Sequence, residues 1–421
     1  MNVLQKLEIL ADAAKYDASC ASSGSERKNS IASQGIGSTD SMGICHSYTP
    51  DGRCISLLKI LMTNFCLYEC AYCVNRTSSN VPRARLTVQE IVNLTMEFYK
   101  RNYIEGLFLS SGIIQNADYT MEQVVAVARS LRLEHRFNGY IHLKTIPEAS
   151  PELLAEAGLY ADRLSINVEL PTEVSLNELA PEKNARSINR SMGNLKEGIS
   201  EYKESKKQAR KQSNKKLLSP KFSPSGQSTQ MIIGADTSND VTILNKSNQL
   251  YQSYSMKRVY YSAFSPIPDA SKDLPLKPPP LIREHRLYQA DWLLRFYGFS
   301  VDELTETAEN NSDTGMLDLD MDPKLAWAVN HRELFPVNLN KADYESILRV
   351  PGIGVTNAKR IVKQRRVNAI RFEDLTKLKL SIPKVSLFVE TLDHHPSPAS
   401  LEASAFSERF KSPQSNQLNL F

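Results

Sequence analysis

The sequence predicts an α/β protein in which a large domain built on a parallel sheet is followed by a smaller second domain and a flexible tail. From residue 56 onward, short β-rich runs alternate with amphipathic stretches, which is the pattern of βα units. The 421 residues also exceed what one hydrophobic core usually organises. The residues from Ser397 onward are polar and include Pro and Ser, as expected for a flexible tether.

Six strands joined by helices are expected in the large domain. The strands cover residues 56–62, 106–110, 140–146, 163–170, 228–234 and 258–264. The first connecting helix spans 87–101, because Thr87 and Glu90 form a capping box and apolar residues recur with helical spacing. A second capping box, Thr120 with Gln123, is expected to open the next helix.

The remaining segments are two helices and two irregular stretches. A short helix covers 151–157, and Gly158 is expected to close it in the left-handed conformation. A long polar helix lies within 187–216, and the basic run 203–221 is interpreted as a solvated helix face followed by a loop. Residues 20–43, rich in Ser and Gly, are either an extended surface segment or a lid over the mouth of the large domain.

The loop after the first strand carries Cys66, Cys70 and Cys73 in the order Cys-x3-Cys-x2-Cys. Three thiolates can hold three irons of a [4Fe-4S] cube, whereas a fully ligated electron-transfer cluster takes four cysteines. The fourth iron is therefore expected to stay open for a ligand that is not protein.

Two other uses of the cysteines are weighed against this one. A structural zinc site would need a fourth ligand, for which Cys45, His46 and Cys54 are available. A disulfide framework is disfavoured in a chain of this length whose six cysteines all lie between Cys20 and Cys73.

The cysteine spacing, with the aromatic Tyr72 directly before the last cysteine, resembles the radical S-adenosylmethionine (SAM) superfamily. The resemblance implies a partial (β/α)6 barrel and two cofactors, a [4Fe-4S] cluster and S-adenosyl-L-methionine. In that family the open iron binds the amino and carboxylate groups of SAM, and one electron from an external donor yields a 5'-deoxyadenosyl radical. The sequence identifies neither a catalytic residue nor the substrate atom, and Tyr72 is assigned only to cofactor binding.

Polar residues at the carboxyl ends of the strands are further candidates for cofactor binding, because loops at that end build the site in βα barrels. After the second strand, Ser110, Ser111 and Gly112 stand where the family has a Gly-Gly-Glu turn whose backbone receives the methionine amino group. The acidic residue is missing here, so only the turn carries over. Lys144 on the third strand is expected to pair with the cofactor carboxylate or a substrate phosphate.

The fourth strand carries three polar residues on one face. Ser165, Asn167 and Glu169 alternate with apolar residues, so the period of two places their side chains together. Polar groups that face a barrel interior need partners. The resemblance implies that a ribose and a methionine carboxylate supply them, and the alternative is an edge strand with a solvated face. His142 is expected to be a satisfied interior histidine, and Gln230 is another inward candidate.

Residues 338–366 resemble a helix-hairpin-helix DNA-binding module whose core is the hairpin Pro-Gly-Ile-Gly at 351–354. Residues 341–371 hold eight basic and two acidic residues, a net charge of +6, against 4 − 6 = −2 for the remainder. Such a patch favours an anionic partner. The expected phosphate contacts are Gly352, Ile353 and Gly354 of the hairpin and Lys359, Arg360 and Lys363 of the next helix. A protein-interaction hairpin is the alternative.

The last five residues resemble the short peptides by which bacterial replication and repair proteins dock on the sliding clamp. Leu420 and Phe421 would fill an apolar pocket of the clamp, and Gln417 would form a hydrogen bond at its rim. Leu418 also belongs to the expected clamp-binding residues. This predicts a sliding clamp as a possible partner of the tail.

The order of these parts, with the stretch 45–54, resembles a bacterial family of DNA modification or repair radical SAM proteins whose naming links it to a uracil-DNA-glycosylase-like protein. The resemblance implies that partner. The expected domains are an N-terminal segment packed on the barrel, the barrel, a helical connection, the helix-hairpin-helix domain and the tail: 1–54, 55–300, 301–336, 337–390 and 391–421.

The favoured function is therefore a radical SAM enzyme that modifies or repairs a nucleotide in DNA. Acidic residues near the N-terminus argue against a signal peptide, and no apolar run reaches the roughly 20 residues of a membrane helix, so a cytoplasmic protein is expected. Three alternatives stay open: an enzyme that modifies RNA, a DNA-bound iron–sulfur redox or scaffold protein without turnover, and a zinc-stabilised DNA adaptor.

Overall fold

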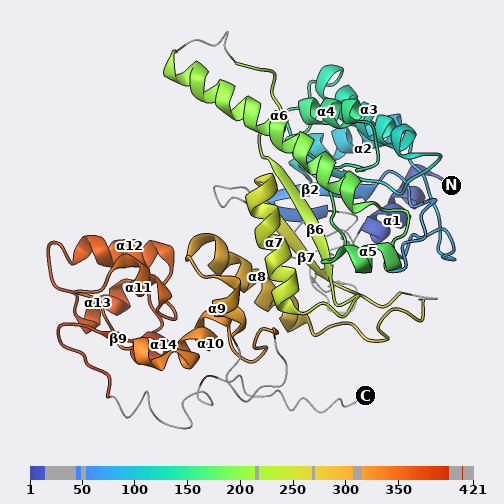
Figure 1. The fold of residues 1–421 in the computed structure, drawn as a ribbon. Helices are drawn as coiled ribbons and strands as arrows, with labels where there is room; N and C mark the ends of the chain where they lie inside the picture. The colour runs from blue at the N-terminus through green and yellow to red at the C-terminus, as the bar shows by residue number, and fades with distance from the viewer. Residues whose placement is uncertain are drawn as a thin grey trace, which may run out of the picture. The chain divides into compact units, whose positions relative to one another are not determined.

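A computed structural model describes residues 1–14, 44–48, 54–213, 218–267, 271–306, 315–397 and 410, with side chains left out at 46–48 and 54. The chain divides into two compact units (Figure 1). Unit 1 comprises Met1–Ser238 and Gln249–Pro279, and unit 2 comprises Asn239–Asn248 and Pro280–Phe421. In the described residues, no helix is both long and apolar enough to cross a membrane.

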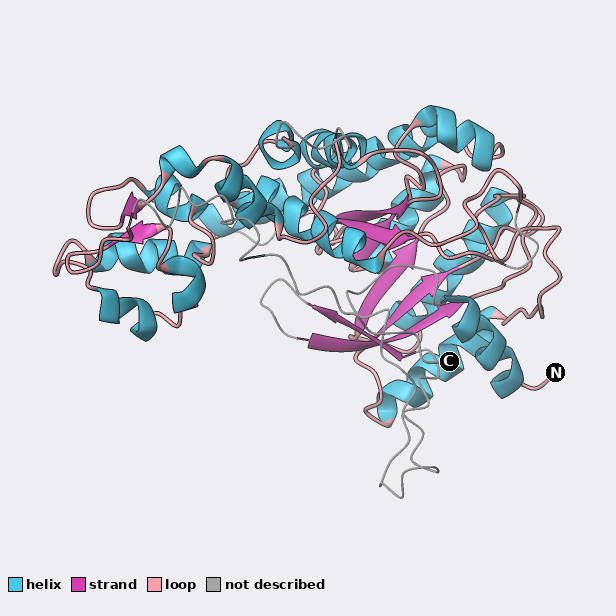
Figure 2. Ribbon diagram, turned by 90° about the horizontal axis from the view of Figure 1, so that it is seen from below, coloured by secondary structure: helices cyan, strands magenta, loops and turns pink. Residues whose placement is uncertain are grey.

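Unit 1 is built on a curled, seven-stranded sheet whose strands follow one another in chain order (Figure 2). The strands are β1 Ile44–Tyr48, β2 Cys54–Leu61, β3 Gly106–Ser110, β4 Tyr140–Lys144, β5 Arg163–Ser165, β6 Gln227–Ile233 and β7 Arg258–Ala263. β2 to β7 are parallel, and β1 is added antiparallel to β2. The predicted fold class, a partial (β/α)6 barrel, is confirmed. The edge strand β1 was not predicted.

Helices precede or connect the strands of the sheet. They are α1 Val3–Ala14, α2 Val88–Lys100, α3 Ala117–Leu133, α4 Pro151–Tyr160, α5 Glu173–Leu179 and α6 Ala185–Lys211, with α7 Asp240–Tyr254 between β6 and β7. The capping box of Thr87 and Glu90 is present at the start of α2, as predicted. Residues Leu57, Leu107, Ile141 and Leu164 of neighbouring strands are buried in the core.

Three boundaries differ from the prediction. α3 begins at Ala117, because the Asn116 side chain accepts a hydrogen bond from the Tyr119 N–H (2.7 Å) and caps the helix before Thr120 can. Gly158 lies inside α4, not after it, and a Cβ there would stand 2.3 Å from the Phe222 ring, so it is a packing glycine. The regular part of β5 ends at Ser165, five residues earlier than expected.

Unit 2 is a helical domain with a two-stranded parallel ladder. Its elements are α8 Leu281–Phe296, α9 Val301–Thr305, α10 Pro323–Asn330, a 3-10 turn Arg332–Leu334, β8 Val337–Asn338, α11 Tyr344–Arg349, α12 Val355–Gln364, α13 Phe372–Lys377, α14 Ile382–Val385 and β9 Val389–Glu390. β8 pairs with β9 and so closes the segment that contains α11 to α14. The predicted C-terminal helical domain is confirmed.

Candidate functional site

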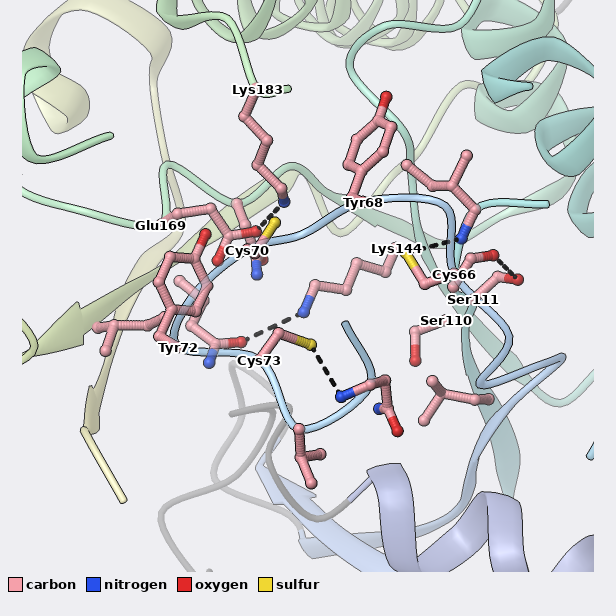
Figure 3. Close-up of a pocket in the computed structure, with 18 of the residues that line it drawn as sticks. Cys66, Tyr68, Cys70, Tyr72, Cys73, Ser110, Ser111, Lys144, Glu169 and Lys183 are labelled. Atoms are coloured by element: carbon pink, nitrogen blue, oxygen red, sulfur yellow. Dashed lines mark hydrogen bonds and ion pairs between the residues drawn. The ribbon is translucent and has the colours of Figure 1, made fainter. Parts of the chain in front are cut away.

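A pocket lies at the carboxyl ends of the parallel strands of unit 1, and all three cysteines of the Cys-x3-Cys-x2-Cys loop line it (Figure 3). It encloses about 1290 Å³ of empty space, with solvent at its mouth included. Its other polar lining residues are Tyr68, Tyr72, Asn75, Ser110, Ser111, Lys144, Thr145, Glu148, Asn167, Glu169, Lys183, Gln230, Ser262 and Ser265. Residues from several strand ends and the loops that follow them therefore line one pocket, as expected for a βα barrel.

The cysteine loop is fixed against the turn that follows β3. The N–H group of Gly112 donates to the Thr63 carbonyl (2.8 Å), and that of Leu67 donates to the Ile113 carbonyl (2.8 Å). A Cβ on Gly112 would lie only 2.3 Å from the Phe65 carbonyl oxygen. Glycine is therefore needed at this turn because two backbones approach closely, which is one of its usual roles.

Two thiol sulfurs accept backbone hydrogen bonds. The N–H of Ile113 points at Cys66 Sγ (3.5 Å), and the N–H of Asn75 points at Cys73 Sγ (3.4 Å). Hydrogen bonds to cluster sulfurs are among the features that set the potential of an iron–sulfur centre.

Arg83 is hydrogen-bonded to the backbone on both sides of the cysteine loop, a role that no sequence pattern indicated. Its guanidinium donates to the backbone carbonyls of Asn64, Asn75 (2.8 Å), Arg76 (2.6 Å) and Ser79 (2.9 Å). One rigid fork therefore joins both ends of the cysteine loop, and a lysine has no geometry to replace it.

A buried ion pair stands beside Cys70. Glu169, only 6% exposed and with φ 65, accepts a hydrogen bond from the Lys183 ammonium. Burial opposes the charged form of Glu169, but Lys183 and Lys144 hold the pKa of its carboxyl below the usual value. Burial likewise opposes the ammonium of Lys183, yet Glu169 and Cys70 outweigh it and raise this pKa. Lys183 was not singled out in the sequence, because its partner lies 14 residues away outside regular structure.

The residues present offer a cluster and SAM both thiols and a buried polar group. Within the part of the chain that the structure describes, the amide oxygen of Asn75 is buried without a hydrogen-bond partner, so the pocket offers a polar group to a ligand. Burial raises the pKa of the Cys70 thiol to about 12 and that of Cys73 to about 11. Since iron binds thiolates, cluster binding has to release these protons.

No three or more His, Cys, Asp or Glu side chains among the described residues are arranged to hold a single metal ion. A cube makes a different demand, because the three thiolates bind three different irons and the fourth iron stays open. The cysteines therefore need to face one cavity, as they do, and not one point.

The predicted cofactor residues do not all reach the pocket. Lys144 lies in it and contacts Gln230 Oε1 (3.4 Å), and Asn167 lines it although the regular strand has ended. Ser165 lies deeper in the barrel, where its hydroxyl pairs with His142 Nε2 (3.0 Å). Burial lowers the pKa of His142 well below its ordinary value. His142 is thus a neutral interior histidine, as expected.

The zinc alternative depends on residues that are only partly described. Cys45 packs against the apolar cluster of Ile55, Leu57 and Phe108. The side chains of His46 and Cys54 lie outside the described residues, as do Cys20 and the segment 20–43.

The hairpin of unit 2 joins α11 to α12. Gly352 has φ 84, and a Cβ there would stand 2.9 Å from Val385 Cγ2, so both conformation and space require glycine. Ile353, 1% exposed, anchors the hairpin in the core. Gly354 is the N-cap of α12 and provides no side-chain cap, whereas Asp322 and Asp343 cap α10 and α11. The first-turn N–H groups of α12 are therefore available to an anion.

The basic residues near this hairpin fall into two groups. Lys359, Arg360 and Lys363 are exposed on α12 and make no ion pair within the described residues. Arg349 instead pairs with Glu303 (2.6 Å), and Arg365 donates to the Leu339 carbonyl (3.1 Å). The net charge of +6 therefore overstates the positive charge available to a partner, because Arg349 and Arg365 interact within the protein. The predicted clamp-binding residues Gln417, Leu418, Leu420 and Phe421 lie outside the described residues.

Comparison with protein families agrees with both sites. Residues 60–213 match the radical SAM superfamily, and residues 335–385 match a helix-hairpin-helix motif. The chain therefore contains a radical SAM domain and a helix-hairpin-helix motif. The radical SAM superfamily uses a [4Fe-4S] cluster and SAM, which confirms the two predicted cofactors. No curated protein matches the chain in sequence.

Solved structures with a similar fold include the [FeFe]-hydrogenase maturase HydG from Carboxydothermus hydrogenoformans, with 11% identity, a TM-score of 0.41, and coverage of 56% of this chain and 50% of that one. Methylornithine synthase (PylB) shows 15% identity, a TM-score of 0.39 and coverage of 55% and 61%. The radical SAM methyltransferase TsrM from Kitasatospora setae shows 11% identity, a TM-score of 0.33, and coverage of 54% of this chain and 38% of that one. The chain spans about half the length of HydG, and scores this low carry no argument about function.

Proposed function

We propose that this protein is a radical SAM enzyme that cleaves S-adenosylmethionine reductively at a [4Fe-4S] cluster and uses the 5'-deoxyadenosyl radical to modify or repair a nucleotide in DNA. The observation that carries the proposal is the placement of Cys66, Cys70 and Cys73 around one strand-end pocket. The second unit adds a hairpin whose following helix, α12, has no side-chain cap at its N-terminus. When bound, the cluster supplies the electron that cleaves SAM.

The residues of the pocket divide the work of binding. Cys66, Cys70 and Cys73 would hold the cluster, and Arg83 would keep their loop in place. Lys144 and Asn167 lie where they can pair with a carboxylate and with ribose hydroxyls, and the backbone of the turn at 110–112 can receive an amino group. Ile146, Ile232 and Phe264 provide apolar lining, which limits water around a reactive species.

DNA binding would come from unit 2. A phosphate can sit on the free N–H groups at the start of α12, and the exposed Lys359, Arg360 and Lys363 can reach neighbouring phosphates. Such contacts hold the backbone and read no sequence. Choice of the nucleotide would therefore rest with the pocket of unit 1.

Three partners belong to the same proposal. An external electron donor is required by the chemistry of the cofactors. A uracil-DNA-glycosylase-like protein is implied by the family that the sequence resembles, and a sliding clamp by the C-terminal peptide. The proposed location is the cytoplasm.

The test is to reconstitute the full chain anaerobically, add dithionite and SAM, and measure 5'-deoxyadenosine with duplex DNA, single-stranded DNA or structured RNA present. The nucleic acids are then digested to nucleosides and analysed by mass spectrometry. Formation of 5'-deoxyadenosine together with a new deoxynucleoside supports the proposal. A new ribonucleoside alone would favour an RNA-modifying enzyme. A bound cluster that forms no 5'-deoxyadenosine even when DNA is present would favour a redox or scaffold protein. Colourless protein that contains zinc would favour a zinc-stabilised DNA adaptor.

A further inference from the structure

A buried lysine lies directly behind the hairpin of unit 2, in a part of the chain that precedes the helix-hairpin-helix match. Lys324 in the first turn of α10 is 7% exposed, and its ammonium donates a hydrogen bond of 2.6 Å to the Ile353 carbonyl. The same ammonium stands 4.8 Å from the centre of the Tyr297 ring. Buried lysines are rare unless they are paired, and here the nearest acceptor is a backbone oxygen of the hairpin itself.

We propose that Lys324 is a positioning residue for phosphate binding: its ammonium fixes and polarises the peptide between Ile353 and Gly354, so that the Gly354 N–H becomes a stronger donor to a DNA phosphate. The inference rests on the proposed binding of DNA by this hairpin. It extends the binding module beyond the helix-hairpin-helix itself to α10.

The argument follows from the geometry of a single peptide. In a trans peptide the C=O and N–H groups point in opposite directions, so an ammonium on the Ile353 oxygen stands behind the Gly354 N–H. A charged donor on the oxygen strengthens the N–H at the other end, because hydrogen bonds in a chain polarise one another. In the described residues of this unit, the Gly354 N–H has no acceptor within the protein.

A purely structural role is the competing explanation, because the first turn of α10 also holds the neighbouring α14. Asp322, the N-cap of α10, accepts a hydrogen bond from Lys384 of α14 (2.5 Å). A turn that ties two parts of the module together could matter for stability alone. The charge of Lys324 separates the two explanations, since only the polarising role depends on it.

The surroundings of Lys324 make its charge sensitive to pH. The charged groups that face it are Asp322 on its own helix and Lys384 of α14, and the ring of Tyr297 covers it from the segment after α8. Burial lowers the pKa of the Lys324 ammonium to about 7, with Asp322 opposing and Lys384 adding to the effect. The ammonium is present below this pH and is lost above it, so DNA affinity should fall as the pH rises through neutrality.

The experiment compares the full-length wild-type protein with Lys324→Met, Lys324→Arg and the control Lys277→Met. Lys277 is exposed in unit 1, so its replacement removes the same charge without touching the hairpin. Binding of a fluorescein-labelled duplex is measured by anisotropy at pH 6.0 and pH 8.5 and one fixed ionic strength, and melting curves report folding. The four proteins differ only at Lys324 or Lys277, so a pH dependence that changes in the Lys324 variants and not in Lys277→Met reports Lys324.

We expect Lys324→Met to bind roughly tenfold more weakly than wild type at pH 6.0 and to lose most of the pH dependence, as a charge-assisted bond predicts. Lys324→Arg should keep its affinity at pH 8.5, because arginine stays charged. If Lys324→Met weakens binding equally at both pH values, Lys324 is an anchor only and the inference fails. If it binds as wild type does, the inference fails while DNA binding stands. A wild-type protein that binds no duplex overturns both.

Discussion

Replacing Gly112 with alanine should displace the cysteine loop and impair the cluster, although the change adds a single methyl group. The new Cβ would lie 2.3 Å from the Phe65 carbonyl oxygen and 3.2 Å from that of Thr63, whereas ordinary contacts begin at about 3.4 Å. Backbone cannot rotate away as a flexible side chain can. The segment that leads into Cys66 therefore has to move by roughly 1 Å, and overpacking of this kind costs roughly 1–3 kcal/mol.

A displacement of this size has a large effect on a site that depends on position. Misplacement by about 1 Å can lower a reaction rate by roughly 100-fold. We expect Gly112→Ala to bind less iron after anaerobic reconstitution and to form 5'-deoxyadenosine at a rate at least tenfold lower, an order-of-magnitude expectation from the same principle.

The matched control is Gly193→Ala in the interior of α6, where a Cβ would meet nothing within 4 Å. This variant should be stabilised by roughly 0.5–1 kcal/mol, because alanine favours the helix. Iron content, 5'-deoxyadenosine formation and melting temperature are measured for both variants. A Gly112→Ala protein with wild-type iron and activity would refute the reasoning that this contact positions the loop.

Three further predictions concern other contacts. Arg83→Lys keeps the charge but should lower iron content after reconstitution, since lysine cannot bond four carbonyls at once, and wild-type iron content would contradict this. Lys183→Met should lower the melting temperature of unit 1, because a buried Glu169 without its partner costs about 3–5 kcal/mol. Adding Glu169→Gln should restore part of the loss, and an unchanged melting temperature of Lys183→Met would contradict the pairing. Duplex affinity should fall steeply with salt, and Lys359→Gln should reduce the slope by about 0.9, with Lys277→Gln unchanged; an unaltered slope for Lys359→Gln would place that residue away from phosphate.

Features set by short stretches of sequence were predicted well. The spacing of Cys66, Cys70 and Cys73 and the hairpin at 351–354 are local patterns, and both were placed in the right structural setting. The capping box at Thr87 was also found, because its two partners are three residues apart. The start of α3 was missed since Asn116 and Thr120 are both suitable caps, and only tertiary packing buries Thr120.

Contacts between distant residues left no pattern to detect. Arg83 serves carbonyls up to 19 residues away, and Lys324 bonds one that is 29 residues away. Neither partner is a side chain, so no pairing of charges in the sequence points to them. Glu169 shows a different case. Alternation placed it on one face with Ser165 and Asn167, and it lines the pocket with Asn167 although the regular strand ends at Ser165 and its own φ is 65, whereas Ser165 does not line the pocket.

The most direct test of the account is an iron and sulfide count, with electron paramagnetic resonance before and after SAM is added, on anaerobically reconstituted wild-type protein and its Cys66→Ser, Cys70→Ser, Cys73→Ser triple variant. We predict about four irons and four sulfides per chain, a signal that changes when SAM binds, and loss of both in the variant. A cluster that still forms in the triple variant would contradict the claim that these thiolates leave one iron open for the cofactor. A wild-type cluster whose electron paramagnetic resonance signal does not change when SAM is added would contradict it as well.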